Sequence, residues 1–155
     1  MPNDGSPSTA TGRTLGTWFS GVYAILVGIL FFAMQTTKLW RPEAAEAEMA
    51  KMPFGRFDWG YVWADTLVPG PALLAGGILL LIRRRAARNL GRLLVFAGFA
   101  LNLYAMIFFW VGLEVVGQPL AAGELWMNLA FTILGVLVMI HVALQAMREG
   151  RTIHS

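Results

Sequence analysis

The sequence contains no cysteine. This absence excludes disulfide bonds, thiolate nucleophiles, CxxC redox pairs and cysteine metal ligands within the chain. Several longer signatures are also missing, namely GxGxxG, the P-loop, HExxH and a Ser/His/Asp set with a family spacing. The sequence therefore predicts no cofactor and no metal site, and it names no catalytic residue.

Charge is scarce as well. Charged residues make up 14% of the 155 residues, and hydrophobic residues make up 57%. A soluble domain carries about 25% charged residues, so this chain has too few to cover a surface that faces water. Lipid is the solvent that removes this need, and the composition predicts an integral membrane protein.

Four apolar runs are long enough to be membrane spans. A helix needs about 20 mostly apolar residues to cross a hydrocarbon core of about 30 Å. None of the runs alternates like a strand, so we expect an all-α fold, an integral membrane four-helix bundle. The tail at 1–12 is polar and is expected to be a disordered cytoplasmic segment, ahead of a single four-span domain at 13–155. The expected spans are about 15–37, 59–82, 93–113 and 125–147.

Lysine and arginine predict the orientation, because basic residues favour cytoplasmic loops. Four of the twelve lie in the first loop. The other eight flank the opposite ends of the spans and are Arg13, Arg83, Arg84, Arg85, Arg88, Arg92, Arg148 and Arg151. This bias places both the N and the C terminus in the cytoplasm, with the chain in the cytoplasmic (inner) membrane. The arginines from Arg83 to Arg92 form a membrane-flanking loop in this interpretation, one that contacts anionic headgroups and is no nucleic-acid signal.

The second span is predicted to be kinked or broken at Pro69-Gly70-Pro71. Proline lacks a backbone N–H and disfavours helix in the residue before it. Only about 18 Å of helix fits between Pro71 and Arg83, which is too short to cross. The segment before the prolines must therefore enter the membrane too, and the break is either a simple kink or part of a binding site.

Two further local features are expected. Pro42 and the glutamates after it favour a short helix at about 42–52 outside the membrane. Gly21 and Gly28 lie on one face of the first span, and Ala72 and Gly76 on one face of the second. Small residues let helix backbones approach closely, either inside one chain or across a dimer.

The densest polar group lies near the predicted outer boundary. Its members are Asp65, Glu114, Glu124, Asn128 and Trp63. Carboxylates crowded in a partly dry site act as acids or bases or bind ligands. The alternatives are that they pair with the cations of the first loop, and that Trp63 belongs to an interfacial belt of aromatic residues.

Three polar residues are predicted inside the membrane, where such groups are costly and therefore candidates for function. Tyr23 and Asn102 each lie roughly 15 Å inward from a basic boundary, and we hypothesise that they hydrogen-bond to each other. His141 lies roughly 10 Å from the boundary at Arg148. It is a candidate haem ligand, proton relay or quinone contact, although an intramembrane bis-histidine site within one chain lacks its second ligand.

Three functions remain open from these residues. The first is an accessory, assembly or scaffold component without catalysis of its own. The second is a small-molecule binding or transport protein with an outward-facing polar site near Asp65, Glu114 and Glu124. The third is a membrane enzyme acting on a lipid-soluble substrate. The expected partners are the lipid bilayer and another membrane protein or a second copy of the chain, with no nucleic acid.

Overall fold

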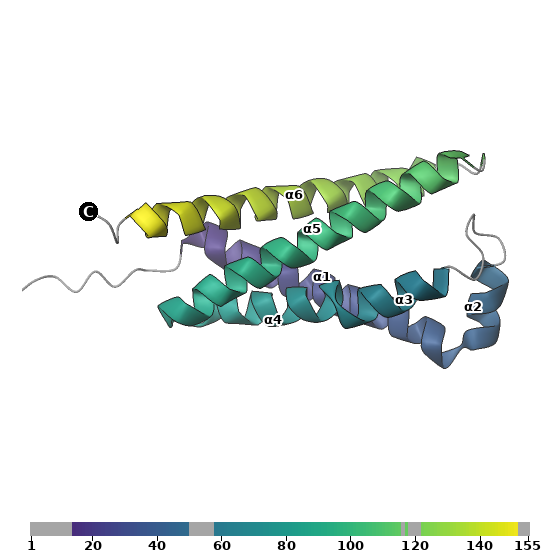
Figure 1. Cartoon of the computed structure of the whole chain (residues 1–155), viewed down its shortest axis with the longest axis horizontal. Coiled ribbons are helices and arrows are strands. Elements are labelled where there is room, and N and C mark those ends of the chain that lie inside the picture. The colour runs from purple at the N-terminus through teal and green to yellow at the C-terminus, as the bar shows by residue number, and fades with distance from the viewer. Residues whose placement is uncertain (1–13, 50–57, 116, 118–121, 152–155) are drawn as a thin grey trace, which may run out of the picture.

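A computed structural model describes residues 14–49, 58–115, 117 and 122–151 (Figure 1). Within these residues the protein is all-helical, with no strand. The tail expected at 1–12 lies outside the described residues. In chain order the helices are α1 (Leu15–Trp40), α2 (Pro42–Met49), α3 (Asp58–Leu67), α4 (Pro69–Leu81), α5 (Arg85–Val115) and α6 (Ala122–Arg151).

Three helices of the described chain, α1, α5 and α6, are long and apolar enough to cross a membrane. Helix α4 is apolar but shorter. Large hydrophobic side chains are exposed along all three long helices, for example Leu26, Leu93 and Leu137. Such a surface suits lipid and would be costly in water.

Each long helix extends beyond the run that predicted it. Helix α1 continues to Trp40, and α6 runs from Ala122 to Arg151. The charges that end an apolar run mark the edge of the hydrocarbon core, whereas the backbone bonds of a helix continue into the headgroup region. The short helix expected at 42–52 begins at Pro42 and is described as far as Met49.

The largest correction concerns the arginines between the second and third spans. They were expected in a loop, but α5 begins at Arg85, so Arg88 and Arg92 are helical. The connection is only the segment 82–84, and the first bond of α5 runs from the Arg88 N–H to the Arg84 carbonyl at 3.1 Å. Arginine is a good helix former, which is the physical reason that the helix starts this early.

The interruption expected at the prolines is present. Helix α3 ends at Leu67 and α4 begins at Pro69, with Val68 between them, and the two helices follow one another along the molecule (Figure 1). Pro69 and Gly70 are buried. The Gly70 carbonyl lies close to Gly28 of α1, where a Cβ would come within 3.1 Å of it. The break is therefore packed against α1.

Helix α4 lies between α1 and α5 and contacts both through glycines. A Cβ on Gly77 would lie 2.6 Å from the Gly21 backbone oxygen, so α1 and α4 are in backbone contact there. On the α5 side, a Cβ on Gly91 would lie 2.8 Å from the Gly76 oxygen. The close approach predicted from Gly21, Gly28 and Gly76 thus occurs inside one chain.

Helix α6 lies along α5 on the side away from α4 (Figure 1). Gly135 of α6 admits the ring of Phe99, whose Cδ1 would be 3.0 Å from a Cβ at that glycine. The apolar core joins α1, α4, α5 and α6 and consists of Ala24, Val27, Leu73, Leu80, Val95, Phe99, Val138 and Val142.

Candidate functional site

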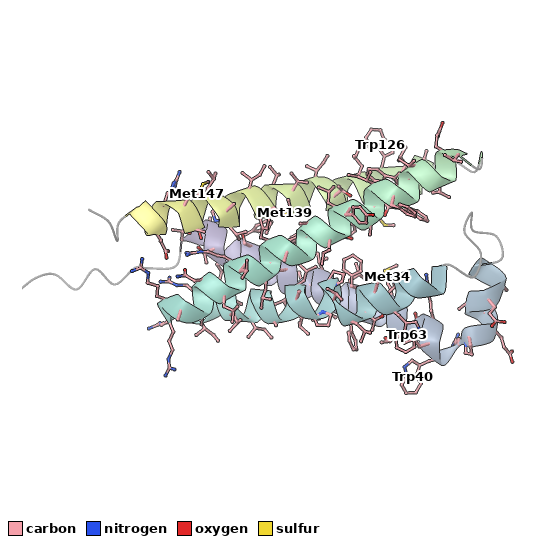
Figure 2. All side chains as sticks on the ribbon, in the orientation of Figure 1. Met34, Trp40, Trp63, Trp126, Met139 and Met147 are labelled. Carbon is pink, nitrogen blue, oxygen red and sulfur yellow. The ribbon has the colours of Figure 1, made fainter. Side chains whose placement is uncertain are left out.

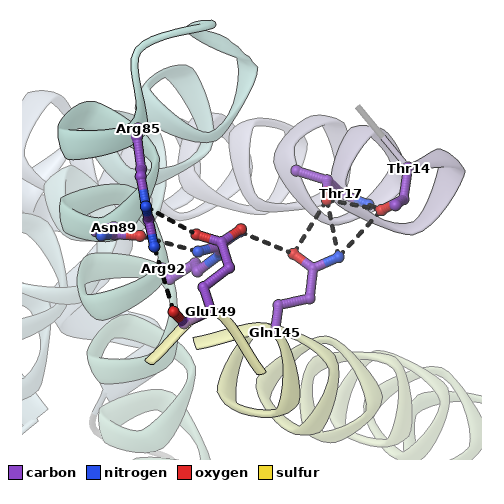
Figure 3. A network of polar contacts seen from close by, with 7 residues as sticks. All are labelled: Thr14, Thr17, Arg85, Asn89, Arg92, Gln145 and Glu149. Atoms are coloured by element: carbon purple, nitrogen blue, oxygen red, sulfur yellow. Dashed lines mark hydrogen bonds and ion pairs between the residues drawn. The ribbon is translucent and has the colours of Figure 1, made fainter. Parts of the chain in front are cut away.

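Polar side chains from three helices meet at one end of the molecule, where α1 and α5 begin and α6 ends (Figure 3). Hydrogen bonds and ion pairs connect them across the helices. We call this group the Arg92 cluster; its members are Thr14, Thr17, Arg85, Asn89, Arg92, Gln145 and Glu149.

Arg92 is the centre of the cluster. Its side chain is only 5% exposed, and Nη2 donates to Glu149 Oε1 at 2.6 Å. Nη1 donates to Asn89 Oδ1 at 2.9 Å, and Nη2 also lies 3.5 Å from Gln145 Oε1. A buried guanidinium is tolerated only when it is paired and hydrogen-bonded, and this one has both kinds of partner.

Arg85 binds the end of α6. Its Nη2 donates to the backbone oxygen of Glu149 at 3.2 Å, and its Nε lies 3.7 Å from Glu149 Oε2. The last carbonyls of a helix have no partner within the helix, and they carry its partial negative charge. Arg85 therefore holds the C-terminal turn of α6 against the first turn of α5.

Gln145 extends the cluster to α1. Its Nε2 donates to the hydroxyls of Thr14 at 3.0 Å and Thr17 at 2.9 Å, and its Oε1 lies 3.0 Å from the Thr17 hydroxyl. Thr14 is also the N-cap of α1 and accepts from the Thr17 N–H at 3.2 Å. One amide side chain thus fixes the start of α1 to α6.

Arg88 lies in the same region but outside this network. It is 6% exposed, and its buried Nε has no hydrogen-bond partner. Arg85, Arg88 and Arg92 all act electrostatically on Glu149. Among the described residues, three guanidinium groups thus surround a single carboxylate.

His141 stands two turns before Glu149 on α6. Its imidazole lies against Gly16 of α1, where a Cβ would come within 2.6 Å of Nε2 and would also overlap Cε1. Nε2 is buried and has no hydrogen-bond partner. The contact fits a packing role for the ring, which the missing side chain of Gly16 makes possible.

The Arg92 cluster was not anticipated from the sequence, although a signal for it exists. Gln145 and Glu149 follow His141 at intervals of four on α6, and Arg88 and Arg92 are also four apart on α5. Residues four apart share one helix face. As a run of basic residues, the arginines predict an orientation, and no role is predicted from the sequence for Gln145 or Glu149.

The hypothesis that Tyr23 and Asn102 bond to each other is wrong. The Tyr23 hydroxyl donates to the backbone oxygen of Phe131 in α6 at 3.1 Å. The Tyr23 ring also stacks on Phe19 and on Phe99, with ring centroids 6.0 and 5.6 Å apart. Helical repeat places Asn102 at the expected depth, but depth alone does not determine which side chains face one another.

The expected outer group is only partly described. Glu114 is exposed at the end of α5, Asn128 is half-buried on α6, and Trp63 is 50% exposed on α3. The side chains of Asp65 and Glu124 lie outside the described part of the structure.

The labelled tryptophans show how the end of the molecule opposite the Arg92 cluster is arranged. Helix α3 packs on α1 and α4, and Trp63 lies on the opposite side of the molecule from Trp126 of α6 (Figure 2). Trp40, Trp63 and Trp126 lie toward one end and Met147 toward the other. This distribution fits an interfacial belt, and it does not bring Trp63 to the α5–α6 end.

The Arg92 cluster joins the ends of three helices and concentrates positive charge there. In the described chain, no group of three or more His, Asp or Glu residues is placed to hold a metal ion. Compared with known proteins, the chain matches no protein-family model, no curated protein and no solved structure.

Proposed function

We propose that this chain is a small multipass protein of the cytoplasmic (inner) membrane that acts as an accessory, assembly or scaffold component. It crosses the bilayer four times with both termini in the cytoplasm. It carries out no reaction itself and works through its contacts with lipid and with another membrane protein or a second copy.

Four spans are supported by the way α3 and α4 follow one another. Helix α4 alone covers about 20 Å, which is short of the hydrocarbon core. Adding α3 gives the length that a span needs. A span made of α3 and α4 then puts the start of α1 on the same side as the arginine-rich start of α5 and the end of α6, in agreement with the basic-residue bias.

The observation that carries the functional proposal is that the buried polar groups bond one helix to another. Thr17, Gln145 and Arg92 bond across α1, α6 and α5, and Tyr23 bonds across α1 and α6. Residues that a catalytic or transport site would need are thus engaged in holding helices together. The break before Pro69, where a site was considered, is packed against α1.

The membrane topology has a direct test, because the natural chain has no cysteine. Single cysteines would be placed at exposed Ala86 of α5 and exposed Ala122 of α6. A membrane-impermeant maleimide should label Ala122→Cys in intact cells and Ala86→Cys only after the membrane is opened. Labelling of both, or of neither, in intact cells would contradict the proposed orientation.

The functional test compares the partner complex with and without the chain. The chain is first purified in a mild detergent, and the proteins that co-purify with it define the partner complex. The amount of this complex is then measured after deletion of the gene. We expect the complex to decrease on deletion and to recover with the wild-type chain. It should recover equally with Asp65→Asn, Glu114→Gln and His141→Ala, because the proposal assigns no chemistry to them.

The alternatives predict a different pattern. An outward-facing binding or transport site requires that Asp65→Asn or Glu114→Gln abolish function while the protein still accumulates. If the chain is an enzyme that uses His141, His141→Ala must abolish function while the protein still accumulates. Either result would replace the accessory role.

A further inference from the structure

The first turns of α5 concentrate positive charge in an unusual place. Arg85, Arg88 and Arg92 occupy positions i, i+3 and i+7, which share one helix face. The first turn of α5 contains no acidic residue. The N-terminus of a helix is its positive end, so cations there raise the local potential and anions lower it.

Arg88 is a buried arginine whose burial is not explained by a hydrogen bond in the Arg92 cluster. It is 6% exposed, and its buried Nε has no hydrogen-bond partner among the residues that the structure describes. A guanidinium has five N–H donors, and its burial without a partner is costly. A buried polar group without a partner needs a physical explanation, and a bound anion is one that suits a guanidinium.

Glu149 does not supply the missing negative charge. Its carboxylate pairs with Arg92 at 2.6 Å and lies 3.7 Å from Arg85. The backbone oxygen of the same residue receives Arg85 Nη2. Among the described residues, a single carboxylate thus faces three guanidinium groups, which leaves a net positive charge at this end of α5.

We propose that Arg88, together with Arg85 and Arg92, binds the phosphate group of an anionic phospholipid from the cytoplasmic leaflet. The guanidinium fork matches phosphate oxygens, and the start of α5 adds free N–H groups and a favourable dipole. The side chain of Arg85 is 53% exposed and forms the entrance. Leu90 and Leu93 of α5 are 50% and 63% exposed, and they give the acyl chains an apolar surface at the same end of the helix.

This inference rests on the proposed membrane topology, which the cysteine labelling tests separately. Correct labelling without lipid selectivity would leave the topology standing and reject the lipid site. Labelling that places Ala86→Cys outside would reject the topology itself, whatever lipid is bound.

The experiment measures thermal unfolding of the full chain in nanodiscs by tryptophan fluorescence. One set of discs contains phosphatidylcholine, and a second contains phosphatidylcholine with phosphatidylglycerol. We expect a higher melting temperature in the second set, because a ligand that binds the folded state stabilises it. Native mass spectrometry should then find phosphatidylglycerol retained on the protein.

A third arm adds inorganic phosphate to phosphatidylcholine discs at matched ionic strength. If phosphate alone gives the full rise and phosphatidylglycerol adds nothing, the site takes free phosphate and the lipid is rejected as its ligand. If wild-type protein shows no rise with either, the proposal is rejected outright.

Matched variants locate the site. Arg88→Gln should weaken phosphatidylglycerol binding by about tenfold or more, because charge-assisted bonds are lost. Arg84→Gln removes the same charge from an exposed residue just before α5 and should bind like wild type. Equal losses in both variants would mean diffuse surface attraction. If Arg88→Gln does not fold, phosphatidylglycerol binding is measured with Arg88→Lys instead, since lysine keeps the charge but not the fork. The comparison of the two lipids with the wild-type protein tests the proposal in either case.

Discussion

Arg92 and Glu149 are 57 positions apart in the chain and form an ion pair with a separation of 2.6 Å. The pair joins the first turns of α5 to the last turns of α6. Arg92 is almost fully buried, whereas the side chain of Glu149 is 30% exposed. Loss of Glu149 would therefore leave a buried charge unpaired, whereas loss of Arg92 would leave a partly exposed charge.

Replacing Glu149 by Gln should destabilise the protein by about 1–3 kcal/mol. Breaking a fully buried pair costs about 3–5 kcal/mol, and the partial exposure of Glu149 reduces this. The double variant Arg92→Met/Glu149→Met should recover most of the loss, because the buried charge of Arg92 is removed together with its partner. Thermal unfolding in detergent measures both, with Glu43→Gln on exposed α2 as the control. A double variant less stable than Glu149→Gln would contradict the pairing.

Replacing Gly77 by Ala should separate α1 from α4. The new Cβ would meet backbone atoms, the Gly21 oxygen at 2.6 Å and the Ile25 nitrogen at 2.9 Å, and backbone cannot move aside as a side chain can. We expect a loss of about 1–3 kcal/mol, the usual cost of overpacking. The control Gly123→Ala places its Cβ in open space, so the melting temperature of this variant should be unchanged or higher. Equal behaviour of the two variants would show that the glycine contact is unimportant.

Gly16 and His141 should be energetically coupled. Gly16→Ala puts a methyl group into the imidazole ring and should lower stability, while His141→Ala removes the obstacle. In the double variant the methyl group fits, so a double-mutant cycle should give a coupling of about 0.5–3 kcal/mol. Additive effects would mean that the ring turns away at no cost.

Tyr23→Phe should cost about 0.6 kcal/mol, the typical worth of an interhelical hydrogen bond within a membrane. The bond lost is the one to the Phe131 backbone oxygen, and the ring stacking on Phe99 is retained. Asn102→Leu should not couple to this change, since no bond joins the two residues. Tyr104→Phe, on an exposed side chain, serves as the control and should have no effect. Measurable coupling between Tyr23 and Asn102 would restore the original hypothesis.

The sequence by itself determined the helices and their apolar character. Runs such as 15–37 and 125–147 are too apolar for a surface in water, and proline chemistry located the break before Pro69 to within a residue. The glycines at 21 and 28 also predicted a close helix contact, because a residue without a side chain has few other uses on such a face.

Only the tertiary structure decided which polar groups meet. Residue counting gives the depth of Tyr23, but the rotation of each helix about its axis determines whether Tyr23 faces Asn102 or Phe131, and many packed contacts set that rotation together. Arg92 looked like a topology signal because charge ends an apolar run. Its meeting with Glu149 required the helix to continue past that charge, with α6 lying alongside it, and no local pattern in the chain encodes that arrangement.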